Sequence, residues 1–356
     1  MNINELGWSE FFGAQMERWQ GSGLAPGRVI GDFGQQYAVV TEHGRCAAQV
    51  SGHFQYIVAG RADYPSVGDW VLVRGEGDPM IVEKVLERKS YFSRQASGRR
   101  CDEQVIAANI DIMFVVASLD GGRNFTPRGI ERYIVMVREG GAEPVLVLNK
   151  CDLCAEREDY RAAAKSVAPG VEVLMVSALT GEGMDAVGGM LSSGVTGAFT
   201  GPSGAGKSSL INALRGNDAL RTGPLRENDM RGRHTTTGSE LVMLPSGGMV
   251  IDTAGLRELR PFGEKASLDS AFPEIAEAAT GCRYSDCGHT DEPGCAVLAM
   301  VADGSIEFER YQNYVSIRKE MEALEAMKSE KGRMERKARD KKLSKLVKEF
   351  NRDFRH

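Results

Sequence analysis

The sequence predicts a multidomain α/β protein with a small N-terminal β-barrel, a central α/β domain and a C-terminal cysteine-rich domain with a helical tail. Short β-rich runs separated by Gly, Asp and Pro fill residues 26–95, and apolar strands alternate with amphipathic helices over 110–252. Three cysteines and one histidine fall within residues 282–295. We therefore expect an N-terminal helical extension followed by three domains, with bounds at 1–24, 25–95, 105–265 and 266–356.

The overall composition is that of an ordinary globular protein. The chain has 356 residues, of which 42% are hydrophobic and 26% are charged. The longest apolar run, Ile112 to Leu119, is far shorter than the roughly 20 residues that span a bilayer. The N-terminus has no basic segment leading into an apolar one, so we expect no secretory signal. Together with cysteine spacing that is metal-like rather than typical of disulfides, this favours the cytoplasm and no membrane partner.

Charge is distributed unevenly along the chain. Residues 316–356 contain 14 Lys or Arg against 8 Asp or Glu, a balance of +6, whereas the first 315 residues carry −11. A basic end on an acidic body suggests a polyanionic partner for that end.

The first 95 residues are expected to form a short helix and then a barrel. Leu6, Phe11, Met16 and Trp19 are spaced among polar residues in a way that predicts one apolar helix face. About five short strands follow, including a run from Ala47 to Gly60, and favour a barrel of the oligonucleotide-binding (OB) type. A structural barrel that binds no ligand is an equally good interpretation. Residues 95–104 are expected to be a linker.

Four strand–helix units are expected after the linker. The predicted strands are 110–118, 144–150, 171–178 and the run leading to Thr200, followed by a hairpin of 240–244 and 249–252. Thr126-Pro127 provides an N-cap and a proline for the first helix, which is expected to run to Arg138. Near-continuously apolar strands of this kind indicate a mostly parallel sheet with helices on both faces.

The run Gly201 to Ser208 fits G-x-x-x-x-G-K-[ST] between a predicted strand and a predicted helix, which is the setting of a phosphate-binding loop. Its N–H groups would cradle phosphate oxygens, Lys207 would reach the β- and γ-phosphates, and the Ser208 hydroxyl would bind Mg²⁺. A glycine-rich turn before an ordinary helix is the alternative. The expected phosphate-binding residues are Gly201, Pro202, Ser203, Gly204, Ala205, Gly206, Lys207, Ser208 and Ser209.

Two motifs before the loop predict that the base is guanine. Asn149-Lys150-Cys151-Asp152 fits N-K-x-D, and an aspartate here accepts from both the N1–H and the exocyclic amine of guanine, a donor pair that adenine lacks. Lys150 would lie along the base plane and Asn149 would hold the loop in shape. Ser177 and Ala178, at the end of another strand, could offer backbone N–H groups to the guanine O6.

Residues after the loop resemble the switches that sense a γ-phosphate. Asp252 and Gly255 fit D-x-x-G, with the aspartate holding Mg²⁺ through water and the glycine amide meeting the γ-phosphate. Thr236 is the expected second metal contact, so Ser208, Thr236 and Asp252 form the predicted Mg²⁺ set. Leu256 stands where many GTPases place a water-orienting Gln, which predicts slow intrinsic hydrolysis. His234 is the candidate to position water, and a switch-loop histidine without catalytic role is as good an interpretation.

The order of these motifs is unusual. Base motifs come first, then the phosphate loop, then the switches, which is a circular permutation of the usual GTPase order. The site can survive because its residues lie on loops at strand ends. In this order the D-x-x-G segment is joined directly to the C-terminal domain.

A metal knuckle is expected after residue 265. Cys282, Cys287, His289 and Cys295 supply three thiolates and one imidazole, which suit tetrahedral Zn²⁺ and leave no open position for chemistry. A disulfide pair or scattered buried cysteines are the alternatives. A helix from Ile306 to Met327 is expected next, with Ile317, Met321 and Leu324 on one face, and then a basic tail over 328–356.

This combination resembles the circularly permuted, ribosome small-subunit-dependent GTPases of bacteria (the RsgA/YjeQ/YloQ type). The resemblance rests on NKCD, SA, GPSGAGKS, RGRHTTT, DTAG and the C-x4-C-x-H-x5-C knuckle, and it spans nearly the whole chain. It implies an OB-type barrel, a permuted P-loop GTPase domain and a zinc-knuckle domain. It further implies GTP hydrolysis to GDP and phosphate, stimulated by the small subunit, in late maturation of that subunit, with 16S rRNA contacts and a monomeric protein.

Two other functions are compatible with the residues alone. One is an ATP-using P-loop protein in which NKCD is coincidental, and the other is an RNA-binding module whose nucleotide is never turned over. Asp152→Asn separates the first from a GTPase, and phosphate release with and without small subunits separates the second.

Overall fold

The computed structural model describes residues 2–34, 36–58, 60–75, 77–95, 103–121, 124–216, 239–252 and 265–326. The chain forms two compact units, Met1–Arg260 and Pro261–His356. Among the described helices there is none whose length and apolar character would suffice to cross a bilayer.

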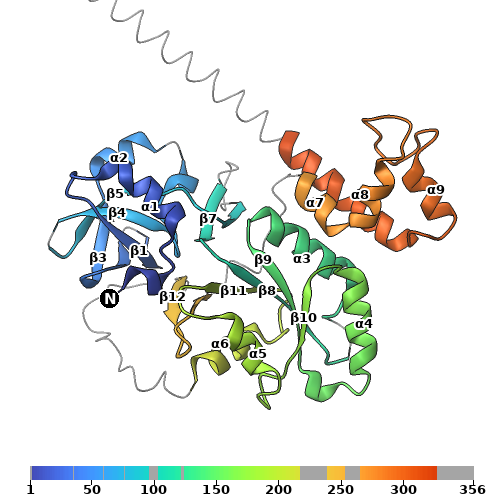
Figure 1. Ribbon diagram of the computed structural model, residues 1–356, viewed down its shortest axis with the longest axis horizontal. Helices are drawn as coiled ribbons and strands as arrows, with labels where there is room; N and C mark the ends of the chain where they lie inside the picture. The colour runs from blue at the N-terminus through green and yellow to red at the C-terminus, as the bar shows by residue number, and fades with distance from the viewer. Residues whose placement is uncertain are drawn as a thin grey trace, which may run out of the picture. The chain divides into compact units, whose positions relative to one another are not determined.

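The first unit begins with the small barrel that the sequence predicts (Figure 1). Its strands run in the order β1-β2-β3-β5-β4, and β4 pairs back with β1 to close the sheet. The strands β3 and β5 are parallel, and the other neighbours are antiparallel. Inward-facing Val, Ala, Tyr and Met side chains fill the interior. The five strands are β1 (Ala25–Asp32), β2 (Tyr37–Thr41), β3 (Gly44–Val50), β4 (Trp70–Arg74) and β5 (Met80–Val85).

Three local predictions for this region are wrong. The N-terminal segment is not one helix but η1 (Ile3–Leu6), α1 (Glu10–Met16) and η2 (Glu17–Trp19), because Gly7 ends the first turn at a φ of 85°. Because a new helix begins at Glu10, a different face is buried from the one predicted. Phe12 is buried and Phe11 is 41% exposed.

The other two differences concern strands. The β-rich run 47–60 ends as a helix, α2 (Gly52–Ile57), because the Ser51 hydroxyl accepts from the Phe54 N–H and caps it. The expected linker separates two strands, β6 (Tyr91–Gln95) and β7 (Glu103–Ala108), which pair as an antiparallel ribbon. Residues 96–102 lie outside the described residues.

The α/β part of the first unit is built on a sheet in the order β10-β9-β8-β11-β13-β12. All neighbouring pairs are parallel except the β12–β13 hairpin, as predicted. Figure 1 shows α3 and α4 together on one side of these strands and α5 and α6 together on the other. The strands are β8 (Ile112–Ser118), β9 (Glu143–Asn149), β10 (Glu172–Met175), β11 (Thr196–Thr200), β12 (Glu240–Met243) and β13 (Met249–Asp252). The helices are α3 (Pro127–Glu139), α4 (Arg157–Val167), α5 (Met184–Met190) and α6 (Lys207–Arg215).

The barrel and the α/β sheet are joined through the backbone. Gly31 of β1 pairs with Glu240 of β12, so that both parts belong to one 11-stranded sheet. Arg28 of β1 lies at this junction and is 1% exposed. Its guanidinium donates to the carbonyls of Leu6, Gly68 and Asn109 and to the Thr196 hydroxyl of β11. Burial lowers the pKa of Arg28 to about 10, which leaves it charged at neutral pH.

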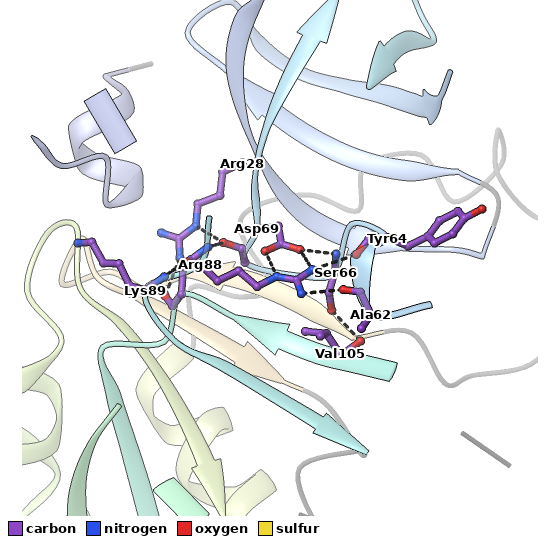
Figure 2. A network of polar contacts seen from close by, with 10 residues as sticks. Arg28, Ala62, Tyr64, Ser66, Asp69, Arg88, Lys89 and Val105 are labelled. Carbon is purple, nitrogen blue, oxygen red and sulfur yellow. Dashed lines mark hydrogen bonds and ion pairs between the residues drawn. The ribbon is translucent and has the colours of Figure 1, made fainter. Parts of the chain in front are cut away.

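A second arginine, Arg88, anchors the segment that leads into β4, and its side chain is 14% exposed. Both nitrogens of one edge of the Arg88 guanidinium donate to the Asp69 carboxylate, at 2.8 and 2.7 Å, and its remaining contacts are the carbonyls of Ala62 and Tyr64 (Figure 2). Asp69 is fully buried, and its Oδ2 also accepts from the Ser66 N–H. Because every buried charge has partners here, the network fixes the loop between η3 (Arg61–Asp63) and β4.

The described part of the second unit consists of helices and the irregular knuckle segment 280–295. It contains α7 (Lys265–Ala271), α8 (Pro273–Ala279), α9 (Ala296–Ala302) and a helix over 308–326. Ile317 and Met321 of the last helix are buried, as expected, and Leu324 is half-buried. Phe272 packs edge-on against Tyr314 at 5.5 Å between ring centroids. The predicted basic tail, 328–356, lies outside the described residues.

Candidate nucleotide and metal sites

The loop between β11 and α6 has the backbone expected of a phosphate cradle. Gly201, Gly204 and Gly206 adopt φ values of 132°, 81° and 95°, a region that favours glycine. A Cβ on Gly201 would lie 2.3 Å from the Val116 carbonyl oxygen, so glycine is also needed for close packing. The Lys207 ammonium folds over the loop and donates to the carbonyls of Gly201 and Pro202, at 2.7 and 2.6 Å. Ser203, Ser208 and Ser209 are exposed.

Asn149 joins the base motif to this loop. It is 1% exposed, its Nδ2 donates to the Ala205 carbonyl at 2.9 Å, and its Oδ1 accepts from the Ala178 N–H at 3.2 Å. One side chain therefore holds together three loops that lie far apart in the sequence. Asn149, Ala178 and Ala205 meet because β9, β10 and β11 all end at the same edge of the parallel sheet.

Lys150 makes the second contact between the base motif and the loop. Its Nζ donates to the Gly204 carbonyl at 2.9 Å and to Asp120 Oδ2 at 2.5 Å. The lysine backbone is left-handed, with φ 62° and ψ 34°. Asp152 follows in the short helix η4 (Cys151–Leu153) and is half-buried, between the buried Cys151 and the 65%-exposed Leu153.

The Ser177-Ala178 turn closes the same edge. Ser177 is fully buried, its hydroxyl accepts from the Thr180 N–H at 3.1 Å, and its N–H donates to the Glu182 carbonyl. Leu179, the next residue along, is 87% exposed.

Asp252 ends β13 at this edge too. The strand is parallel to β11, with Ala198 opposite Ile251, so Asp252 lies beside the last residues of β11, just before the phosphate loop. Arg215 Nη2 lies 3.9 Å from its carboxylate. The other expected switch residues, His234, Thr236 and Gly255, and the segments that contain them lie outside the described residues.

Two polar residues at this edge, Asp120 and Asn124, were not predicted from the sequence. Asp120 accepts from Lys150 and from the Ser118 hydroxyl, and Asn124 donates to that same hydroxyl at 3.0 Å. The hydrogen bond from Lys150 holds the pKa of Asp120 below its usual value. A signal was present, because Asp120 directly follows a predicted strand at the carboxyl edge of the sheet.

The expected knuckle residues of the second unit come together. The ligand atoms of Cys282, Cys287, His289 and Cys295 all lie within 4.8 Å of one another. The sulfurs of Cys282 and Cys295 are 3.8 Å apart, and each lies 3.5 Å from His289 Nδ1. Tetrahedral zinc with Zn–S bonds of about 2.3 Å requires sulfurs about 3.8 Å apart, whereas a disulfide requires about 2 Å. The donor set fits zinc, and the three cysteines of the knuckle are not disulfide-bonded.

Residues outside the ligand set hold the knuckle in shape. The Glu292 carboxylate accepts from the N–H groups of Thr290, Gly288 and Asp291, and these bonds lower its pKa to about 2. The Tyr311 hydroxyl donates to the His289 carbonyl at 2.7 Å. Cys295 also caps α9, with its sulfur accepting from the Leu298 N–H.

A phosphate loop held against an N-K-x-D loop at one edge of a parallel sheet, with the base motif earlier in the chain, defines the class: a circularly permuted P-loop GTPase. The comparisons with known proteins agree. A family model described as RsgA GTPase matches residues 85–261. "Small ribosomal subunit biogenesis GTPase RsgA 2" of Lactiplantibacillus plantarum is 40% identical over 357 residues, which is 99% of this chain and 100% of the relative. "Small ribosomal subunit biogenesis GTPase RsgA" of Leptospira interrogans is 39% identical, covering 93% of this chain and 92% of the relative.

Solved structures show the same likeness. YjeQ from Thermotoga maritima is 28% identical with a TM-score of 0.63, covering 84% of this chain and 98% of that one. YloQ, described as a circularly permuted GTPase, is 26% identical with a TM-score of 0.60, covering 84% and 96%. The chain belongs to the RsgA GTPase family.

Proposed function

We propose that this protein binds the small ribosomal subunit and hydrolyses GTP to GDP and phosphate during late maturation of that subunit. The observation that carries the proposal is the contact of Asn149 and Lys150 with the carbonyls of the phosphate loop. This contact supports the proposal because it holds the N-K-x-D motif, assigned to guanine, against the loop assigned to the phosphates. Relatives matched over the full chain carry the name of a small ribosomal subunit biogenesis GTPase.

Guanine recognition is assigned to Asp152. Asn149 and the Ser177-Ala178 turn shape the pocket, and the Ala178 N–H donates to Asn149 Oδ1. The half-buried Asp152 carboxylate accepts from the N1–H and exocyclic amine of the base, and adenine leaves it unpaired. At the other end, residues 201–209 hold the phosphates. For this the Lys207 ammonium exchanges the Gly201 and Pro202 carbonyls for phosphate oxygens.

Two metals belong to this proposal. Mg²⁺ would be held by Ser208, Thr236 and Asp252, and it supplies charge neutralisation at the β- and γ-phosphates. Zn²⁺ would be held by the Cys282–Cys295 knuckle in a structural role, since four protein ligands complete its coordination.

The nucleotide state controls the switch segments 221–237 and 252–260. These segments hold the residues assigned to Mg²⁺ and the γ-phosphate, and the second one continues in sequence toward the zinc domain of 266–356. The barrel of 25–95, the GTPase domain of 105–265 and the zinc domain each contribute contacts to 16S rRNA. Hydrolysis weakens the hold on the subunit. The protein acts as a monomer in the cytoplasm.

Phosphate release with GTP and with ATP, each with and without purified small subunits, tests the proposal. We expect slow release from GTP alone, a rise of at least about tenfold with subunits, and no release from ATP. Equal rates with and without subunits would contradict it. His234→Ala should lower the stimulated rate and leave GTP affinity unchanged, and an equal fall in affinity would remove His234 from the catalytic role.

A further inference from the structure

Asp120 belongs to neither the N-K-x-D motif nor the phosphate-loop motif, and both of its carboxylate oxygens accept hydrogen bonds beside the proposed guanine site. Oδ1 accepts from the Ser118 hydroxyl at 2.8 Å, and Oδ2 accepts from Lys150 Nζ at 2.5 Å. Ser118 is fully buried, and its own hydroxyl accepts from Asn124 Nδ2. The carboxylate is therefore held in one place by a buried group at the end of β8.

The strands bring the two charges together. Ser118 of β8 lies opposite Asn149 of β9 in a parallel pair, and the Leu119 N–H donates to the Asn149 carbonyl at 2.9 Å. Asp120 and Lys150 are thus the first charged residues beyond two neighbouring strand ends. Their closeness is a consequence of the sheet register and does not depend on a flexible loop.

Lys150 spans from the base motif to the phosphate loop. Besides Asp120, its ammonium donates to the Gly204 carbonyl, and its Cε lies 3.9 Å from where a Cβ on Gly206 would be. Two acceptors thus fix the far end of a side chain that otherwise rotates freely. The lysine and aspartate side chains are 30% and 28% exposed. A pair this exposed adds little to the stability of the fold, because water and salt screen it.

Fixing the lysine has a different consequence for binding. A lysine side chain has four rotatable bonds, and a ligand that must order it loses affinity by the entropy of that ordering. If the aspartate has already ordered the stem, the nucleotide does not bear this cost. The negative carboxylate also attracts the positive ammonium. The ammonium therefore stays at the Gly204 carbonyl and does not move toward the phosphates.

We propose that Asp120 is a positioning residue for guanine nucleotides: it holds the extended Lys150 stem as one wall of the base pocket. The proposal deepens the guanine site proposed above and rests on it. Asp120 itself touches no part of the nucleotide. Its effect is at the base end, so GDP and GTP depend on it alike.

The test is the dissociation rate of fluorescently labelled GDP from the full-length chain. Asp120→Ala is expected to raise that rate about five- to thirtyfold, with the association rate nearly unchanged. Asp120→Asn, which keeps an oxygen acceptor and loses the charge, should give a smaller rise. Glu158→Ala is the matched control, because it removes the same charge from an exposed pair with Arg161 on α4, 3.6 Å apart. The GDP dissociation rate of Glu158→Ala should equal that of the unaltered protein.

A double-mutant cycle separates positioning from a merely structural role. In a Lys150→Met background, Asp120→Ala should change GDP dissociation by less than about twofold, because the group it positions is gone. Asp120→Ala should also raise the KM for GTP while kcat stays within about twofold. The proposal is wrong if Asp120→Ala speeds GDP dissociation as much in the Lys150→Met background as it does alone. It is also wrong if GDP leaves both Asp120→Ala and Asp120→Asn at the rate of the unaltered protein.

Asp152→Asn shows which proposal has failed. If Asp152→Asn weakens GDP binding and Asp120→Ala does not, only the proposed role of Asp120 is contradicted. If Asp152→Asn leaves GDP affinity unchanged, the proposed guanine site is contradicted, and so is the role of Asp120 that rests on it. Should Asp120→Ala fail to fold, Asp120→Asn carries the same comparison.

Discussion

Replacing Arg28 with Met should destabilise the first unit strongly, because one buried side chain joins the barrel, the N-terminal segment and the GTPase sheet. The guanidinium donates to three backbone carbonyls, of Leu6, Gly68 and Asn109, and to the Thr196 hydroxyl. Methionine fills a similar volume and donates nothing. The variant therefore isolates the loss of hydrogen bonds from the loss of packing.

The magnitude follows from how many acceptors are left without this donor. The Gly68 carbonyl keeps a second donor, Asn109 Nδ2 at 3.0 Å. Leaving the two other carbonyls and the hydroxyl short of a partner costs about 1–3 kcal/mol each. Relief of the desolvation that lowers the pKa of Arg28 offsets part of this cost. We expect a net loss of about 2–4 kcal/mol, a large share of the 5–15 kcal/mol typical of a domain.

Urea unfolding followed by tryptophan fluorescence measures this loss, because Trp70 lies on β4 of the barrel and Trp8 of the N-terminal segment packs against it. The control is Arg74→Met, on a barrel strand whose arginine pairs with Glu83 at 3.4 Å and has a 55%-exposed side chain. It should cost less than about 1 kcal/mol. If the two variants unfold at the same urea concentration, the buried network is not what joins the barrel to the GTPase sheet.

Two further predictions concern the metal knuckle and the phosphate loop. Removing metal with a chelator, or changing Cys282 to Ser, should lower bound zinc from about one equivalent to none and unfold the second unit. Helix content that stays the same after zinc loss would contradict a structural role. Gly206→Ala should weaken GTP and GDP binding more than about tenfold, because its Cβ would lie 2.2 Å from Asn149 Nδ2 at a φ of 95°. Gly216→Ala is the comparison, since Gly216 also has positive φ but has nothing within 4 Å of its Cβ position. Equal nucleotide affinities for these two variants would count against the contact.

Features set by local pattern could be predicted from the sequence. The glycine-rich loop between a strand and a helix, the alternation of strands and helices and the hairpin that ends at Asp252 each depend on residues close together in the chain, and all three are present in the structure. The knuckle is a similar case, because its ligand spacing constrains the loop directly.

Features that depend on pairing between distant residues could not be predicted. Arg28 donates to backbone carbonyls spread from Leu6 to Asn109. Every residue has such a carbonyl, so the sequence does not indicate which ones Arg28 will contact. The β6–β7 ribbon was missed because the polar stretch between its strands has the composition of a linker. The α2 helix was missed because its residues favour strands, and the Ser51 cap decides the outcome.

The central claim is that Asp152 recognises guanine at the site formed by the Asn149 and Lys150 contacts. The most direct test is the base preference of the Asp152→Asn variant. An asparagine has one acceptor and one donor, so it should pair with xanthine, which has a carbonyl where guanine has an amine. We predict that Asp152→Asn weakens GDP binding at least about a hundredfold and binds XDP more tightly than GDP. Unchanged preference for GDP in this variant would contradict the account.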